Sequence, residues 1–227
     1  VIESRGLGDV YKRQANDELK LFLSIIFVVV LVSTLTLYMK EGFSVNDSIR
    51  YGFFQSISIV TTTGYTLEPL SGLGGSIGFL IFILAFIGAC SGSVGGGMKV
   101  WRVLLMLKVG FSNITKIIHP SAVSSVKLNG EKIVSSQIEA VFSFIAIYIS
   151  FFLLFMFILI FQNVDFYSAF SGTAAAINNL GPGLGSFSEN YSTLSDVGKF
   201  TLTMAMIVGR LELFGVLILF VPSFWRS

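Results

Sequence analysis

The chain has 227 residues, of which 53% are hydrophobic and only 12% carry a formal charge. Because soluble domains are about 25% charged, this composition excludes an ordinary water-soluble protein and indicates an integral membrane protein in contact with lipid. The net charge of +2 says little about partners, and a single cysteine, Cys90, excludes an internal disulfide.

The chain begins with a polar segment and a long apolar run. Residues 1–18 are polar and differ in character from the rest, so we expect a tail, whose native origin the sequence leaves open. The run at 19–39 has 21 residues, and at about 1.5 Å per residue such a helix crosses the roughly 30 Å hydrocarbon core of a bilayer. The shorter segment at 46–60 reaches only about 22 Å, so we predict a re-entrant half-helix, with Asp47 suited to its N-terminus.

A short polar loop, Thr61-Thr62-Thr63-Gly64-Tyr65, follows this half-helix, and we call it the first polar loop. An apolar run then begins at residue 77 and is interrupted by the glycine-rich loop, residues 88–97, which has five glycines in ten residues. Each glycine costs a helix interior about 1 kcal/mol, so we expect this loop to open the helix. An apolar pattern resumes at 100–107.

The same order of elements appears a second time after a polar segment at 108–137, which we expect to be a linker. The second polar loop, residues 178–183, has the sequence Asn-Asn-Leu-Gly-Pro-Gly. It follows a predicted spanning helix at 138–161 and a predicted half-helix at 165–177, and it precedes a predicted spanning helix at 200–221.

The matched spacing of the two copies favours an internal duplication. Gly64 and Gly181 are 117 residues apart, and they follow Asp47 and Asp165 by 17 and 16 residues. We therefore predict an all-α membrane protein built from two helix–pore loop–helix repeats, at 19–107 and 138–227.

The distribution of basic residues predicts the orientation. Six Lys or Arg lie between residues 99 and 132, whereas the loops at 66–78 and 183–198 have none. Cytoplasmic loops carry the excess of Lys and Arg, so we place the linker in the cytoplasm and expect both half-helices to re-enter from the outer side. The basic segment would contact lipid headgroups or a cytosolic partner.

The two polar loops have a composition suited to a cation path. Non-helical backbone within a membrane is tolerated only where it is buried in protein or lines water, and its carbonyl groups can replace the hydration shell of a cation. Glycine permits the dihedral angles that this requires, and the negative C-terminal ends of the half-helices would favour a cation. The alternative is that both loops are ordinary extracellular turns. The candidate ion-binding residues are Thr62, Thr63, Gly64, Asn179, Leu180 and Gly181.

The glycine-rich loop allows three interpretations. It lacks the spacing of a phosphate-binding loop, but its small residues suit either a helix-packing face or a flexible loop inside the path. Arg210 lies near the middle of the predicted helix 200–221, where a charge costs roughly 2.5–3.5 kcal/mol and usually faces a cavity or a partner. Snorkelling is the alternative, but we expect carbonyl groups of the loop to bind Arg210, which would hold the loop closed. The candidate gate residues are Gly88, Cys90, Ser91, Gly92, Gly95, Gly96, Gly97 and Arg210.

Four motifs carry a resemblance to a known family: residues 58–65, residues 88–99 with their Gly-Gly-Gly-Met-Lys ending, residues 178–185, and Gly209-Arg210-Leu211-Glu212. From residue 19 to its end the chain resembles the TrkH potassium-uptake subunits of the Trk/Ktr/HKT superfamily. The resemblance implies four helix–pore loop–helix repeats around one pore. This sequence resembles the third and fourth, so the other half of the selectivity filter would come from a missing N-terminal half.

The resemblance also implies the transported ion and the partners. Glycine at the filter positions, here Gly64 and Gly181, implies K+, and the broken helix of the third repeat implies an intramembrane gate at residues 88–97. It further implies a homodimer in the bacterial inner membrane, with a cytosolic ring of regulatory subunits that bind a nucleotide. Neither an enzyme, a resident cofactor nor a nucleic-acid partner is expected.

Two other interpretations stay open. The chain could be a self-contained two-repeat cation channel that completes its filter by dimerising, or a non-conducting assembly subunit. Coding sequence upstream for two further repeats would exclude the first of these.

Overall fold

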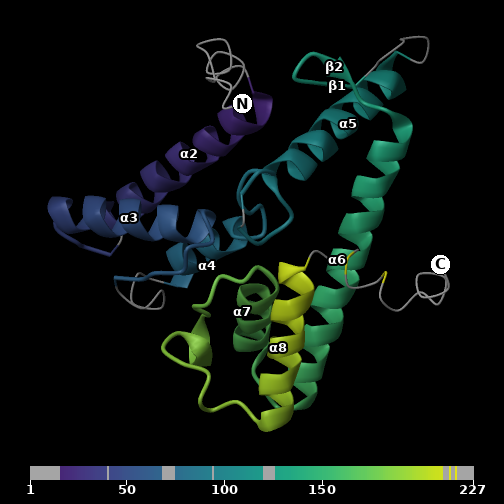
Figure 1. Ribbon diagram of the computed structural model, residues 1–227. Coiled ribbons are helices and arrows are strands. Elements are labelled where there is room, and N and C mark those ends of the chain that lie inside the picture. The colour runs from purple at the N-terminus through teal and green to yellow at the C-terminus, as the bar shows by residue number, and fades with distance from the viewer. Residues whose placement is uncertain are drawn as a thin grey trace, which may run out of the picture.

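Figure 1 shows the computed structural model, which describes residues 16–39, 41–67, 75–93, 95–119, 126–211, 215 and 218. The first 15 residues of the predicted tail, Glu212 and most of the predicted end of the last helix lie outside these residues. Within the described part of the chain, every regular element except one short hairpin is helical, as the sequence predicts.

Two helical groups correspond to the two halves of the sequence. The first contains α2 (Asp17–Met39), α3 (Val45–Val60), α4 (Gly75–Leu84) and α5 (Val100–Ile118). α2 packs closely along α3, and the hydroxyl groups of Ser33 and Ser56 form a buried hydrogen bond of 3.1 Å between them. Small polar residues of this kind let two helices approach closely without leaving a buried hydroxyl group unpaired.

The second group contains α6 (Ser135–Phe161), α7 (Phe166–Ile177), the short 3-10 helix η2 (Gly185–Phe187) and α8 (Asp196–Arg210). The three α-helices pack against one another. Phe144, Tyr148 and Phe152 of α6 form part of the buried core, together with the alanine-rich end of α7. The predicted half-helices match α3 and α7 to within one residue at each end.

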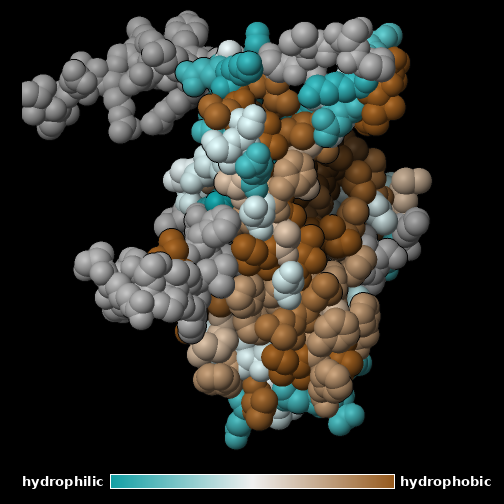
Figure 2. Space-filling model, turned by 90° about the vertical axis from the view of Figure 1, so that its right-hand side faces the viewer, coloured by the Kyte–Doolittle hydropathy of each residue, from teal (hydrophilic) through white to brown (hydrophobic). Residues whose placement is uncertain are grey.

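Two of the described helices, α2 and α6, are long and apolar enough to cross a membrane, by length and composition alone. Figure 2 shows a broad hydrophobic zone between hydrophilic upper and lower ends of the molecule. The other two predicted spans are shorter in the described residues, because α4 stops at Leu84 and α8 is described only as far as Arg210.

The segment predicted as a linker differs from expectation. α5 continues through residue 107 to Ile118, and a hairpin of β1 (Lys127–Leu128) and β2 (Glu131–Lys132) follows it. Asn129 and Gly130 both adopt positive φ angles at the turn, which is the conformation that a two-residue Asn-Gly hairpin turn requires. At the other end of the chain, α2 begins at Asp17, so Asp17 and Glu18 belong to this helix and not to the predicted tail.

Polar side chains begin the two half-helices. Ser44 caps α3 by accepting a hydrogen bond from the backbone N–H of Asp47, one turn into the helix, at 3.2 Å. Asp165 caps α7 by accepting from the N–H of Ser168 at 2.9 Å. This bond, opposed in part by burial, lowers the pKa of Asp165 below its usual range. The acidic residue expected at each start is therefore present, directly as the cap in α7 and within the first turn in α3.

We predict that Asp165→Ala destabilises the solubilised protein by about 1 kcal/mol, because it removes the cap of α7. Asp165→Asn is the matched control, since asparagine caps helices as well as aspartate does. The apparent melting temperature in detergent measures the difference. Equal losses in the two variants at neutral pH would contradict a capping role.

The same carboxyl group predicts a pH dependence. Because the folded-state pKa of Asp165 is lowered, its charge stabilises the fold above the unfolded-state pKa of about 3.9 and loses this effect as the pH falls through the folded-state value. The stability difference between the parent and Asp165→Asn should therefore shrink at acid pH.

Candidate functional site

The two polar loops leave their half-helices with the same backbone structure. The φ angles of Thr62 and Asn179 are 55° and 53°, and those of Gly64 and Gly181 are 84° and 103°. Non-glycine residues rarely adopt positive φ angles. The two loops therefore share an unusual backbone conformation, at Thr62 and at Asn179, as well as the same spacing. Three backbone hydrogen bonds of the first loop also have counterparts 117 residues later in the second. In the first loop, Thr61 donates to Ile57 at 2.9 Å, Thr62 to Ile59 at 3.0 Å and Thr63 to Ser58 at 2.8 Å. In the second, Asn178 donates to Ala174 at 3.1 Å, Asn179 to Ala176 at 3.0 Å and Leu180 to Ala175 at 2.8 Å.

The two polar loops also meet in space. A Cβ atom added to Gly64 would lie 2.0 Å from the carbonyl oxygen of Leu180. This approach is possible only for glycine, so the second polar loop packs directly against the first at its central residue. The structure thus brings together the two triplets predicted from residues 117 positions apart.

Two tyrosine side chains, one buried and one partly buried, support the second polar loop. The hydroxyl of Tyr148 donates to Oδ1 of Asn178 at 2.7 Å, and both residues are almost completely buried. The hydroxyl of Tyr191 donates to the carbonyl of Gly181 at 2.9 Å. Burial raises the pKa of Tyr191 to about 12, so this hydroxyl remains a donor at neutral pH. Neither tyrosine was among the candidates from the sequence, because an aromatic residue in a helix or a loop gives no signal of its hydrogen-bond partner.

The glycine-rich loop lies against both polar loops. The residues on either side of the loop are joined by a backbone hydrogen bond of 3.0 Å, from the N–H of Met98 to the carbonyl of Phe86. The N–H of Gly96 donates to the hydroxyl of Thr62 at 3.2 Å. A Cβ atom added to Gly96 would lie 1.8 Å from the carbonyl oxygen of Asn178. One glycine therefore contacts both copies of the repeated loop.

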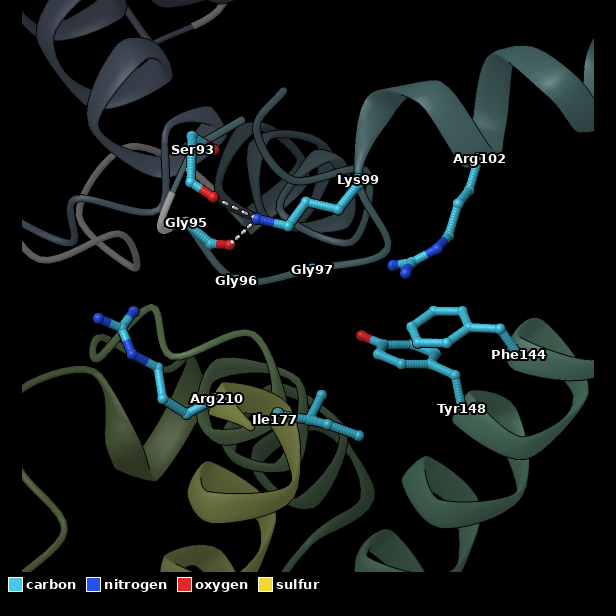
Figure 3. A pocket seen from close by; sticks show the side chains of 11 residues that line it. Ser93, Gly95, Gly96, Gly97, Lys99, Arg102, Phe144, Tyr148, Ile177 and Arg210 are labelled. Carbon is cyan, nitrogen blue, oxygen red and sulfur yellow. Dashed lines mark hydrogen bonds between the residues drawn. The ribbon is translucent and has the colours of Figure 1, made fainter. Parts of the chain in front are cut away.

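A cavity of about 180 Å³ is lined by the glycine-rich loop and by residues of the second helical group, and three basic residues face it: Lys99, Arg102 and Arg210. In Figure 3, Arg210 of α8 lies across the cavity from Lys99. The guanidinium group of Arg102 sits 3.9 Å from the centre of the Phe144 ring, within range of a cation–π interaction. The predicted gate residue Arg210 and the loop it was expected to hold therefore share one cavity.

Lys99 binds the carbonyl groups of the glycine-rich loop. Its ammonium group donates to the carbonyl oxygens of Ser93 at 2.7 Å and Gly95 at 2.6 Å, drawn as dashed lines in Figure 3. The residue is only 8% exposed, so these charge-assisted bonds form in a poorly hydrated environment and are stronger than in water. In the sequence, Lys99 was counted among the cytoplasmic charges and ended the Gly-Gly-Gly-Met-Lys motif, but it was given no role in the loop. Its position two residues after three consecutive glycines was the available signal.

Three gate candidates, Cys90, Ser91 and Gly92, lie in the part of the glycine-rich loop away from the polar loops, whereas Gly88 and Gly97 pack against each other where the loop begins and ends. Cys90 is partly buried and Gly92 is exposed, with no atom within 4 Å of an added Cβ. Ser91 is bonded through its backbone and its hydroxyl to Glu18 of α2. The described residues show no group of three or more His, Cys, Asp or Glu side chains that could hold a metal ion.

Comparison with known proteins identifies the family. The family model TrkH, described as a cation transport protein, matches residues 19–227. The chain belongs to the TrkH family. This confirms the resemblance drawn from the four motifs and agrees with the expectation that the chain is not an enzyme.

Curated TrkH relatives cover nearly the whole chain. The Trk system potassium uptake protein TrkH of Halomonas elongata is 37% identical over 212 residues, which cover 93% of this chain and 44% of that protein. TrkH of Escherichia coli K12 is 39% identical over 213 residues, with the same coverage, and the TrkG protein of that strain is 32% identical over 210 residues. The chain thus spans less than half the length of these TrkH relatives.

A solved structure has the same fold. The crystal structure of the potassium transporter TrkH from Vibrio parahaemolyticus matches with a TM-score of 0.86 and 37% sequence identity, over 93% of this chain and 45% of that one. At this identity the match supports both the fold and the family.

We predict that Gly96→Ala destabilises the protein by about 1–3 kcal/mol, because its methyl group cannot fit against the carbonyl of Asn178. Gly92→Ala is the matched control in the same loop, where the methyl group meets open space. Melting temperatures of the two variants in detergent test the difference. A Gly96→Ala variant as stable as Gly92→Ala would show that the loop does not pack against the second polar loop.

Proposed function

We propose that this chain supplies part of the path through which a TrkH-type protein takes up K+ across the bacterial inner membrane. The observation that carries the proposal is the pair of polar loops with a repeated backbone, which meet where Gly64 contacts Leu180. The names of the relatives, Trk system potassium uptake proteins, support K+ as the transported ion.

The two polar loops would act as two strands of a carbonyl-lined selectivity filter. Carbonyl oxygens of the residues at 62–64 and 179–181 would replace water around a dehydrating K+ without a fixed charge, so the ion could also leave. α3 and α7 end at these loops, and the partial negative charge at their C-termini would favour a cation over an anion. Further strands would come from the rest of a longer protein, of which the relatives are examples.

The glycine-rich loop would be the gate of this path, because it lies directly against both polar loops. Lys99 holds its carbonyl groups, while Arg102 and Arg210 line the same cavity. Three positive charges beside the loop would raise the energy of a K+ ion that leaves the filter on this side. Opening would require this basic cluster and the loop to move apart.

The surroundings of the path follow from the same proposal. The two repeats would cross the membrane with α3 and α7 entering from the outer side, and the hairpin β1–β2 would face the cytoplasm. The protein would form a homodimer, and a cytosolic nucleotide-binding subunit would act on the basic cytoplasmic face. The basic residues between 99 and 132 support this orientation.

We predict that Gly64→Ala abolishes potassium-dependent growth. Alanine at a φ angle of +84° is strained by roughly 1–2 kcal/mol, and its methyl group would also displace Leu180 of the facing loop. The assay is growth on low K+ of an uptake-deficient bacterium that carries the Escherichia coli TrkH with this chain in place of the aligned region.

Gly110→Ala is the matched control for this experiment, because Gly110 lies in α5 and a methyl group there meets no atom within 4 Å. It should grow like the parent. Normal growth of Gly64→Ala at an equal membrane level, measured by immunoblot, would contradict a filter at this position.

We predict that Arg210→Ala raises K+ flux about tenfold, equivalent to about 1.4 kcal/mol of the barrier, because it removes one charge from the cavity. Lys199→Ala is the control: it removes the same charge at the other end of α8, where the side chain is half exposed. Rubidium uptake by cells at matched protein levels measures the effect. Flux unchanged by Arg210→Ala would argue against its role in the gate.

A further inference from the structure

A carboxylate at the start of α2 binds Ser91 of the glycine-rich loop. Glu18 lies in the first turn of α2 and is only 7% exposed. Its two carboxylate oxygens accept hydrogen bonds from Ser91, one from the backbone N–H at 2.5 Å and one from the hydroxyl at 2.9 Å. The contact joins residues 73 positions apart in the sequence.

The burial of the Glu18 carboxylate and its two hydrogen bonds make the contact with Ser91 a strong one. An ionised carboxylate that leaves water is costly unless hydrogen bonds satisfy it, and the two bonds from Ser91 do so with charge assistance. The next glycine, Gly92, has open space around it, so packing there does little to fix this part of the loop. Glu18 therefore holds Ser91, while Lys99 holds the carbonyl groups of Ser93 and Gly95.

The neighbour of Glu18 links the same helical turn to the cytoplasmic hairpin. The carboxylate of Asp17 accepts from the ammonium group of Lys108 on α5 at 2.5 Å. The backbone N–H of Asp17 donates to Oδ1 of Asn129 in the hairpin turn at 2.8 Å. Lys108 also donates to the carbonyl of Lys127 on β1 at 2.9 Å. A continuous set of polar contacts thus runs from the hairpin, through the first turn of α2, to the glycine-rich loop.

We propose that Glu18 is a positioning residue of the gate, which holds the glycine-rich loop against the path and connects its position to that of the hairpin through Asp17 and Lys108. This inference rests on the proposed function of the loop as a gate. A force that moves the hairpin away from α5 would disturb the first turn of α2 and weaken the hold on Ser91. Glu18 and Lys99 thus bind different residues of the same loop: Glu18 binds Ser91, and Lys99 binds residues nearer the cavity.

The test measures loop release and ion flux in the same set of variants. Cys90 precedes Ser91 and is the only cysteine of the chain. Because the charge of Glu18 also acts on the ionisation of this thiol, the labelling rate is followed over a range of pH by mass spectrometry of the Cys90 peptide, and the limiting rate at high pH, where the thiol is ionised in every variant, reports release of the loop. Glu18→Ala removes both bonds, whereas Ser91→Ala removes only the hydroxyl bond and leaves the carboxylate charge in place. Glu139→Ala is the control, since Glu139 is an exposed carboxylate near the start of α6. All are made in the Escherichia coli relative that carries this chain in place of the aligned region.

The expected result is a graded one. Labelling of Cys90 should rise by about tenfold or more in Glu18→Ala, which loses two charge-assisted hydrogen bonds, and by less in Ser91→Ala, which loses one. The double variant should label no faster than Glu18→Ala alone, because both changes break one interaction. Rubidium flux should rise in the same order, and Glu139→Ala should match the parent in both measurements.

Two outcomes would overturn the inference: labelling of Cys90 in Glu18→Ala at the parent rate, or faster labelling without increased flux while Arg210→Ala does increase flux. If neither Glu18→Ala nor Arg210→Ala changes flux although labelling rises, the proposed gate itself is wrong. The Arg210 variant thereby separates failure of this inference from failure of the proposed function.

Discussion

The structure depends on one constraint: backbone that leaves a helix in an apolar environment must find partners for its polar groups within the protein. Three loops face this constraint together. The two polar loops return their first N–H groups to the carbonyl groups of the preceding half-helix, through bonds repeated 117 residues apart. In the glycine-rich loop, one backbone N–H donates to the hydroxyl of Thr62, and two carbonyl groups accept hydrogen bonds from the ammonium group of Lys99. Each polar loop is therefore bonded mainly to its own half-helix, while the glycine-rich loop is joined to the first polar loop by a hydrogen bond and to the second by close packing.

Much of this arrangement could be predicted from the sequence, because it follows from local rules. The lengths of the half-helices, the acidic residue near each start and the break at five glycines are local consequences of capping, length and helix propensity. The extension of α5 beyond residue 107 was missed because the apolar pattern stops there and Lys108 begins a polar segment. In the structure the helix continues, and Lys108 is paired with Asp17. The hairpin was also missed, although Asn129-Gly130 is the strongest short signal for such a turn.

The contacts that fix the glycine-rich loop could not be predicted, because each one joins residues that no local pattern relates. Lys99 was counted among cytoplasmic charges, and Glu18 was assigned to a polar tail. Their burial decides their role, and burial depends on how α2 and α5 pack around the loop. A charge at the end of an apolar run is usually solvated, so composition alone favours the wrong environment for both residues.

The glycines of this site allow the loops to approach one another closely, and this matters more than the flexibility they give to the backbone. Gly64 faces a carbonyl oxygen of the second polar loop, and Gly96 faces another, at distances that no side chain would allow. A loop that is packed in this way and bound by an ammonium group and a carboxylate has one well-defined position. Interfaces of this kind are bistable and do not deform continuously, so the loop would move only when a charged contact is released. If the loop is the proposed gate, regulation of the path would depend on Lys99 and Glu18 at least as much as on the glycines that made the loop conspicuous in the sequence.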